Sequence, residues 1–257
     1  MRKSAAALLL GGVSALLVFG GAAGNATSLL GRTGGSDFED RFQSFDTMRW
    51  QKADGWTNGN YMGCGFRAQN LSVSDGRLAL SITEHPTTGT PYACAEYRTR
   101  KHYGYGTYAV NLKAVKADGV MTAFSTYTGQ PFGHPWDEIT FGINGKDTTK
   151  AELNYVANGV TNHDVVVDLG FDAAKGFHTY SFEWKPDRIT WFADGRPIHT
   201  VQSARDDLPQ TPGRIYVQLW NGKGETSWLK RFQYPGKPVT AEVAWVRYKE
   251  APGDLVN

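Results

Sequence analysis

Several short stretches of the chain place aromatic side chains next to amides and carboxylates. They lie at residues 56–61, 103–106, 124–127, 136–138 and 219–222. Sugars present C–H faces that stack on aromatic rings, and their hydroxyl groups need amide or carboxylate partners, so these stretches could line a carbohydrate-binding surface. The alternative is that most of these rings belong to an ordinary core, because aromatic side chains also dominate protein cores.

The segments that carry these side chains are predicted to be β-strands. Apolar and polar residues alternate over residues 77–83, and Asp194-Gly195 between two apolar runs predicts a two-residue hairpin turn. Similar runs occupy residues 108–113, 120–127, 138–144, 151–156, 177–184, 188–193, 196–201, 214–220 and 243–249. No segment carries a long apolar stripe with helical periodicity. The sequence therefore predicts an all-β fold, a sandwich or jelly roll, in one domain over residues 37–250.

The composition is consistent with such a fold and argues against one class of partner, nucleic acid. The 257 residues include 30 Gly, 8 Trp and only 20% charged residues, which excludes a disordered chain and allows a well-buried core. Removing Arg2 and Lys3 from the 27 basic residues leaves 25, equal to the 25 acidic residues. No basic patch or charge run stands out in the sequence, so nucleic acid is not expected as a partner.

The first 24 residues have the order of a secretory signal peptide. Arg2 and Lys3 precede an uncharged apolar stretch over residues 5–19, and small residues follow up to position 24. This segment predicts a secreted or periplasmic protein with no membrane association after cleavage. The alternative is an uncleaved anchor, for which residues 5–23 are at the short end of a membrane span. Residues 25–36 are polar and small and predict a flexible leader.

The two cysteines, Cys64 and Cys94, would share an oxidising compartment after export. As the only pair in the chain they predict a disulfide, with two buried free thiols as the alternative. The six histidines show no metal-ligand spacing, so neither a metal nor another cofactor is expected.

One stretch carries a more specific pattern. Trp136-Asp137-Glu138-Ile139, followed by Gly-Lys-Asp-Thr-Thr-Lys at residues 145–150 and by Asn154-Tyr155, resembles the bacterial lichenases of glycoside hydrolase family 16. Further matches within residues 38–248 lie at 53–59, 64, 67–68, 94–98, 103–106, 127–129, 169–172, 177–180 and 219–222. The resemblance implies a β-jelly-roll with a concave glucan-binding cleft and a Cys64–Cys94 disulfide. It also implies β-1,3/β-1,4-linked glucans or related exopolysaccharides as ligands.

The catalytic motif departs from that family. Lichenases carry Glu-Ile-Asp-Ile-Glu on one strand, where the first Glu is the nucleophile, the Asp assists it and the second Glu is the general acid/base. The matching residues here are Glu138, Ile139, Thr140, Phe141 and Gly142. The nucleophile is kept at Glu138, but Gly142 has no side chain that could act as the acid/base. A retaining glycosidase needs two carboxyl groups about 5–5.5 Å apart, so this loss bears directly on activity.

A carboxylate on the next strand could compensate. If residues 145–149 connect two antiparallel strands, Gly142 opposes Glu152, whose side chain would begin within about 5 Å of the empty position and on the same face as Glu138. Lichenases usually have Gln at the position that matches Glu152. The pattern suggests that Glu152 is a relocated acid/base, and the alternative is a solvated strand residue with no catalytic part.

The sugar-contacting positions of the family are better preserved. The resemblance implies substrate binding by Asn58, Glu96, Arg98, Tyr127, Trp136, Asn154 and Trp220. Trp136 and Trp220 would stack against sugar rings, and Glu96 with Arg98 would hold hydroxyl groups, unless that pair is a structural salt bridge. Ser125 and Val156 replace a usual aromatic residue and a usual Tyr, which indicates an altered cleft. Ala244 stands where the family often has a calcium-binding carboxylate, so again no metal is expected.

Together these features predict an exported protein that acts on a β-glucan or a related exopolysaccharide. One interpretation is a retaining endo-β-glucanase or transglycosylase in which Glu138 attacks and Glu152 is the acid/base. The second is a catalytically inactive, lectin-like polysaccharide-binding protein. A third lies between them: a nucleophile without an acid could accept only activated donors.

Overall fold

The computed structural model describes residues 35–224 and 226–252. The predicted signal peptide, residues 1–24, and the predicted leader up to residue 34 lie outside the described residues. Gly35 is buried and its amide donates to His102 O at 3.0 Å, so the end of the predicted leader contacts the domain. Within the described residues, no helix is both long and apolar enough to cross a membrane.

Sixteen strands and three short 3-10 helices make up the described domain. The strands are β1 (Phe38–Asp40), β2 (Trp50–Lys52), β3 (Cys64–Phe66), β4 (Leu71–Ser74), β5 (Arg77–Ile82), β6 (Tyr92–Thr99), β7 (Gly106–Lys113), β8 (Val120–Thr128), β9 (Asp137–Asn144), β10 (Lys150–Val156), β11 (Val165–Asp168), β12 (His178–Lys185), β13 (Arg188–Ala193), β14 (Arg196–Gln202), β15 (Arg214–Asn221) and β16 (Val239–Glu250). The 3-10 helices are η1 (Ala68–Asn70), η2 (Gln130–Phe132) and η3 (Arg205–Asp207).

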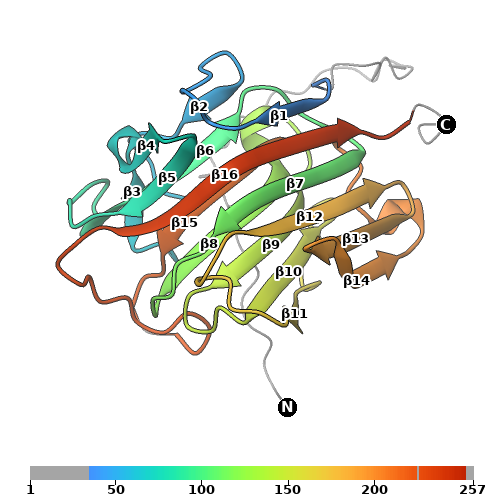
Figure 1. Ribbon diagram of the computed structural model, residues 1–257. Coiled ribbons are helices and arrows are strands. Elements are labelled where there is room, and N and C mark those ends of the chain that lie inside the picture. Colours follow the sequence, from blue (N-terminus) through green and yellow to red (C-terminus); the bar gives the residue numbers. More distant parts are fainter. Residues whose placement is uncertain (1–34, 225, 253–257) are drawn as a thin grey trace, which may run out of the picture.

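The strands form two eight-stranded sheets that face each other (Figure 1). The first sheet has the order β14-β13-β12-β7-β16-β5-β4, with β1 beside β16. The second has the order β11-β10-β9-β8-β15-β6-β2, with β3 beside β6. Strands distant in sequence, such as β7 and β16 or β8 and β15, are neighbours in this arrangement. The predicted all-β sandwich of the jelly-roll type is confirmed.

The hydrophobic core lies between the two sheets. Phe141 of β9 packs against Tyr180 of β12 with ring centroids 4.9 Å apart, and the indole of Trp191 in β13 donates to Thr140 O at 3.1 Å. Because side chains alternate along a strand, the even-numbered residues from Glu138 to Asn144 point away from this core. They lie on the outer face of the second sheet, which we call the site face.

The site face is itself covered. Every residue of β8 and β9 is buried, whereas along β5, which has one face in the core, buried residues alternate with exposed or partly exposed ones. A strand that is buried on both faces must be covered on both. Polar side chains of these two strands, including Ser125, Glu138 and Thr140, are therefore shielded from water, which strengthens the electrostatic effects among them.

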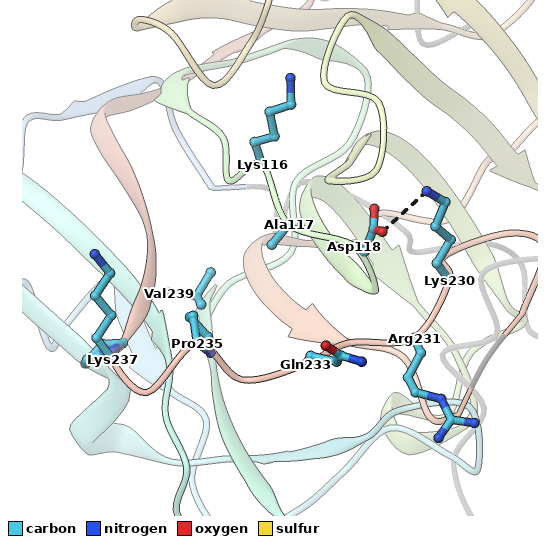
Figure 2. Close-up of a pocket in the computed structure, with 10 residues that line it drawn as sticks. Lys116, Ala117, Asp118, Lys230, Arg231, Gln233, Pro235, Lys237 and Val239 are labelled. Atoms are coloured by element: carbon cyan, nitrogen blue, oxygen red, sulfur yellow. Dashed lines mark hydrogen bonds and ion pairs between the residues drawn. The ribbon is translucent and has the colours of Figure 1, made fainter.

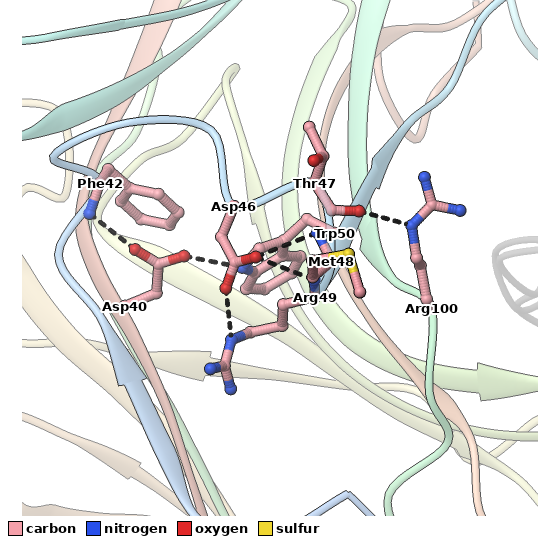
Figure 3. A network of polar contacts seen from close by, with 8 residues as sticks. All are labelled: Asp40, Phe42, Asp46, Thr47, Met48, Arg49, Trp50 and Arg100. Atoms are coloured by element: carbon pink, nitrogen blue, oxygen red, sulfur yellow. Dashed lines mark hydrogen bonds and ion pairs between the residues drawn. The ribbon is translucent and has the colours of Figure 1, made fainter.

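Two aspartates fix the segment that leads to β2, at the edge of the second sheet (Figure 3). Asp40 accepts hydrogen bonds from the Phe42 amide and from the Trp50 indole, both at 2.8 Å. Asp46 accepts from the Arg49 amide at 3.1 Å. These contacts hold β2 beside β6, the strand that carries Glu96 and Arg98.

Three local predictions are confirmed. The Cys64–Cys94 disulfide joins β3 to β6 with the Cα atoms 5.7 Å apart. Asp194 and Gly195 have φ values of 47° and 77°, as a two-residue turn with two left-handed positions requires. Gly142 opposes Glu152 in the pairing of β9 with β10.

Candidate active site

Glu138 lies near the start of β9 on the site face and is 1% exposed. The Thr140 hydroxyl donates to its Oε1 at 2.7 Å, and the Trp136 indole donates to its Oε2 at 3.1 Å. Burial raises the pKa of Glu138 to about 7, and the two hydrogen bonds oppose that rise. Both oxygens are thus positioned, and the carboxyl can exist in either protonation state near neutral pH.

Position 142, where the family resemblance implies an acid/base, has no side chain and has crowded surroundings. A Cβ atom at Gly142 would lie 3.1 Å from Met121 Sδ and 3.3 Å from Glu152 O. Met121 belongs to β8 and is fully buried. Its sulfur borders the volume from which an acid at position 142 would have to extend.

Glu152 lies where the sequence predicts, but its carboxyl group is held elsewhere. The Asn144 amide donates to its Oε1 at 2.8 Å, and the Trp228 indole donates to its Oε2 at 2.6 Å. Asn144 also donates to Trp228 O at 2.9 Å, so the three residues form a closed network. Burial raises the pKa of Glu152, and the two hydrogen bonds oppose the shift.

This network keeps the two carboxyl groups apart. Glu138 and Asn144 are six residues apart on β9, which separates their Cα atoms by roughly 19 Å. The Glu138 and Asn144 side chains extend roughly 5 and 4 Å from Cα. Glu152 Oε1 is within 2.8 Å of the Asn144 amide. Subtracting these lengths leaves Glu152 Oε1 at least roughly 7 Å from the Glu138 carboxyl group, beyond the ~5–5.5 Å of a retaining pair.

A cluster of buried polar side chains lies on the neighbouring strands β6 and β15 of the site face. Glu96 of β6 accepts from Gln218 of β15 at 2.7 Å and from Asn58 at 3.4 Å. Arg98 Nη1 lies 3.5 Å from Glu96 Oε1, and its guanidinium stacks 4.7 Å from the Trp56 ring centroid. Burial raises the pKa of Glu96, while Arg98 and the amides lower it. The predicted Glu96–Arg98 pair thus exists, and its contact with sugar remains a prediction.

The predicted aromatic residues differ in exposure. Trp220 is 2% exposed because it packs against Tyr61 and Trp228, with ring centroids 5.4 and 6.0 Å away. Trp136 is half-buried, so it offers more open ring surface than Trp220. Tyr127 is buried beside Tyr216, with ring centroids 5.9 Å apart.

Asn154 brings an unused acceptor to the same face. It opposes Thr140 across the β9–β10 pair and is 3% exposed. Its Oδ1 is buried and has no hydrogen-bond partner among the described residues. An unpaired buried acceptor is costly, so this oxygen is suited to receive a donor such as a ligand hydroxyl.

Several residues of the site were not predicted from the sequence. Gln218 could have been found, because it lies two residues from Trp220 on the same strand and so shares its face. Trp228 and Asn144 carried no local signal, since their roles depend on a contact across 84 positions of the chain. The part of the chain that the structure describes contains no group of three His, Cys, Asp or Glu side chains placed to hold a metal.

The chain matches a protein family and individual β-glucanases over most of its length. The profile described as "Glycosyl hydrolases family 16" matches residues 58–247. The β-glucanase of Bacillus licheniformis is 46% identical over 225 residues, which cover 87% of this chain and 89% of that protein. The β-glucanase of Bacillus subtilis is 46% identical over 84% of this chain and 87% of that protein.

Solved structures agree with these relatives. The Bacillus licheniformis β-glucanase structure superimposes with a TM-score of 0.79 at 45% identity, covering 84% of this chain and 99% of that one. The laminarinase catalytic domain of Thermotoga maritima has a TM-score of 0.72 at 19% identity, covering 85% and 100%, and shares the fold. The chain belongs to glycoside hydrolase family 16.

Proposed function

We propose that this protein binds a β-linked glucan or a related exopolysaccharide on its site face and does not hydrolyse ordinary glycosidic bonds. The β-glucanase relatives support a β-glucan ligand. The Arg98 side chain is 18% exposed and offers donors for hydroxyl groups, and the half-buried Trp136 offers a ring for a sugar C–H face. Glu96 and Asn154 are buried, so they would accept hydroxyl groups only after the side chains that cover them shift.

The observation that carries this proposal is the absence, among the described residues, of a second carboxyl group placed beside Glu138 to act as its acid. Protonating the leaving oxygen contributes about 10²- to 10⁴-fold to such reactions, and sugar alkoxides are poor leaving groups. Gly142 has no side chain, and Met121 borders the space that an acid would need. Glu152 has both oxygens hydrogen-bonded to Asn144 and Trp228.

A second candidate is a retaining endo-β-glucanase or transglycosylase that uses Glu152 as the acid/base. Two observations favour it. Glu152 lies opposite Gly142, and burial raises the pKa of Glu152, as a general acid requires. In this mechanism Glu152 would have to leave Asn144 and Trp228 and approach Glu138. A separation of roughly 7 Å or more would also fit an inverting enzyme, but in such an enzyme the carboxylate that acts as the base must be open to water.

Binding and cleavage should be measured together on a panel of soluble β-1,3, β-1,4 and mixed-linkage glucans and exopolysaccharides. We expect retention of at least one of them in affinity electrophoresis with no new reducing ends, and no change in either result for Glu152→Gln. Cleavage by the wild type that is lost in both Glu138→Gln and Glu152→Gln would establish the second candidate instead. If the protein retains none of the panel, the proposed binding function is wrong.

We also propose that the protein is exported, on the strength of the N-terminal segment alone. Expression of the full chain in a bacterial host, followed by N-terminal sequencing of the periplasmic and extracellular fractions, tests this. An intact Met1 in the membrane fraction would support an anchor and contradict cleavage.

A further inference from the structure

A basic pocket of about 910 Å³ lies between the β7–β8 and β15–β16 connections, and none of residues 138–142 lines it (Figure 2). Four of its lining side chains are cationic, Lys116, Lys230, Arg231 and Lys237, and one is anionic, Asp118. The chain as a whole has nearly equal numbers of acidic and basic residues. The pocket is therefore a local excess of positive charge that the overall composition hides.

Of these cations, Lys116 and Lys237 have little negative charge nearby, whereas Lys230 has a partner. Lys230 Nζ lies 3.3 Å from Asp118, which offsets it. Lys116 Nζ lies 3.9 Å from Asp172 and its side chain is 65% exposed, so that ion pair is weak. Lys237 is exposed and forms no ion pair within residues 35–224 and 226–252. Lys116 and Lys237 lie on different sides of the pocket in Figure 2.

The surface between the cations suits an organic ligand better than a lone inorganic anion. Ala117, Pro235 and Val239 provide apolar surface, and the Gln233 amide lies among them (Figure 2). Apolar surface with an amide can receive a sugar C–H face and a hydroxyl group. The volume lies in the range of pockets that take organic molecules. The matching ligand is an acidic group on a carbohydrate framework.

One connection borders both the pocket and the site face. Trp228 donates to Glu152 on the site face, and Lys230 and Arg231, two and three residues further along the chain, line the pocket. Lys146, just after β9, donates to Ser227 O at 3.0 Å and also to Trp228 O, which holds this connection against the second sheet. Two residues span at most about 7 Å. The Lys230 edge of the pocket therefore lies within about 7 Å of the Trp228 backbone, at the Glu152 end of the site face.

We propose that this pocket binds a carboxylate-bearing side group of the polysaccharide whose backbone lies on the site face. The inference rests on the proposed function, because it assumes a glucan on that face. It specifies the ligand class further: a β-linked polysaccharide with acidic substituents.

The test compares a mixed-linkage β-glucan with the carboxymethylated form of the same glucan. Dissociation constants are measured at about 0.02 M and about 0.3 M salt, where screening of exposed charges differs strongly. The variants are Lys116→Glu and Lys237→Glu, and the matched control is Lys249→Glu, which makes the same charge change near the end of β16, far along that strand from Val239. We expect tighter binding of the carboxymethyl glucan at low salt, reduced roughly three- to tenfold by either pocket variant and unchanged in the control.

The outcomes separate the two proposals. If the neutral glucan binds but the carboxymethyl glucan has no advantage, or if Lys249→Glu weakens it as much as the pocket variants do, the pocket assignment is wrong and the proposed function stands. If neither form of the glucan binds, the pocket assignment is wrong, and the proposed function is wrong as well when the protein retains none of the panel of glucans and exopolysaccharides. A DNA oligonucleotide that binds as tightly as the carboxymethyl glucan, with the same sensitivity to Lys237→Glu, would overturn the carbohydrate assignment.

Discussion

Replacing Glu138 by Gln should make the stability of the protein less sensitive to rising pH. Burial raises the pKa of Glu138 from its usual 4.5 to about 7. A carboxyl with a higher pKa in the folded state binds more protons there between those two values, so the free energy of unfolding falls as the pH rises through that window. At 1.36 kcal/mol per pKa unit, this loss reaches about 3 kcal/mol above pH 7. A glutamine side chain cannot ionise, so the variant should escape this loss.

The measurement is urea unfolding of wild type and Glu138→Gln at about pH 4.5 and about pH 8, with the change between the two pH values compared. Other titrating groups are common to both proteins and cancel in that comparison. Asn154→Ala is the matched control, since it perturbs the same face without removing an ionisable group and should shift stability equally at both pH values. Identical pH dependence in wild type and Glu138→Gln would show that the carboxylate is well solvated and would refute the argument.

Three further predictions concern the catalytic motif and the disulfide. The double variant Gly142→Glu, Met121→Val should hydrolyse β-glucan roughly 10²- to 10⁴-fold faster than the matched Gly142→Gln, Met121→Val protein, because it supplies an acid in the space that the sulfur vacates. The rate is measured as new reducing ends, and equal rates in the two proteins would contradict this. Aryl β-glycosides with activated leaving groups should be turned over slowly, at a rate that rises with pH through about 7 as Glu138 ionises. That turnover should disappear in Glu138→Ala, and a rate that falls over this window would oppose a nucleophilic role. Serine at both Cys64 and Cys94 should lower the free energy of unfolding by roughly 3–4 kcal/mol, since the bond closes a loop of 30 residues; an unchanged urea midpoint would contradict it.

The parts of the fold that follow from local pattern were predictable. Alternation and a short connection fixed the β9–β10 register, so the opposition of Gly142 and Glu152 could be predicted from the sequence. The Asp194-Gly195 turn was predictable for the same reason, because only a few residue types tolerate its backbone. Strand β6 was not recognised as an apolar run: it is largely buried on both faces, and Glu96 and Arg98 interrupt its apolar character.

The positions of side-chain groups could not be predicted where they depend on contacts with segments distant in the sequence. The register placed Glu152 on the correct face, but Asn144 and Trp228 decide where its carboxyl group lies. Trp228 comes from a connection 76 positions away. The same limit applies to the basic pocket, whose lysines come from two connections and form no run in the sequence.

The position of the Met121 sulfur decides in which order substitutions at positions 121 and 142 can be made. A lone change of Gly142 back to a longer residue brings its Cβ within 3.1 Å of that sulfur and 3.3 Å of the backbone oxygen of Glu152. The first step of any reversal therefore crowds the sheet before the matching second change relieves it. A substitution at Met121 that shortens its side chain therefore has to come first, or together with the change at 142, if a carboxylate is to be placed on this strand without crowding the sheet.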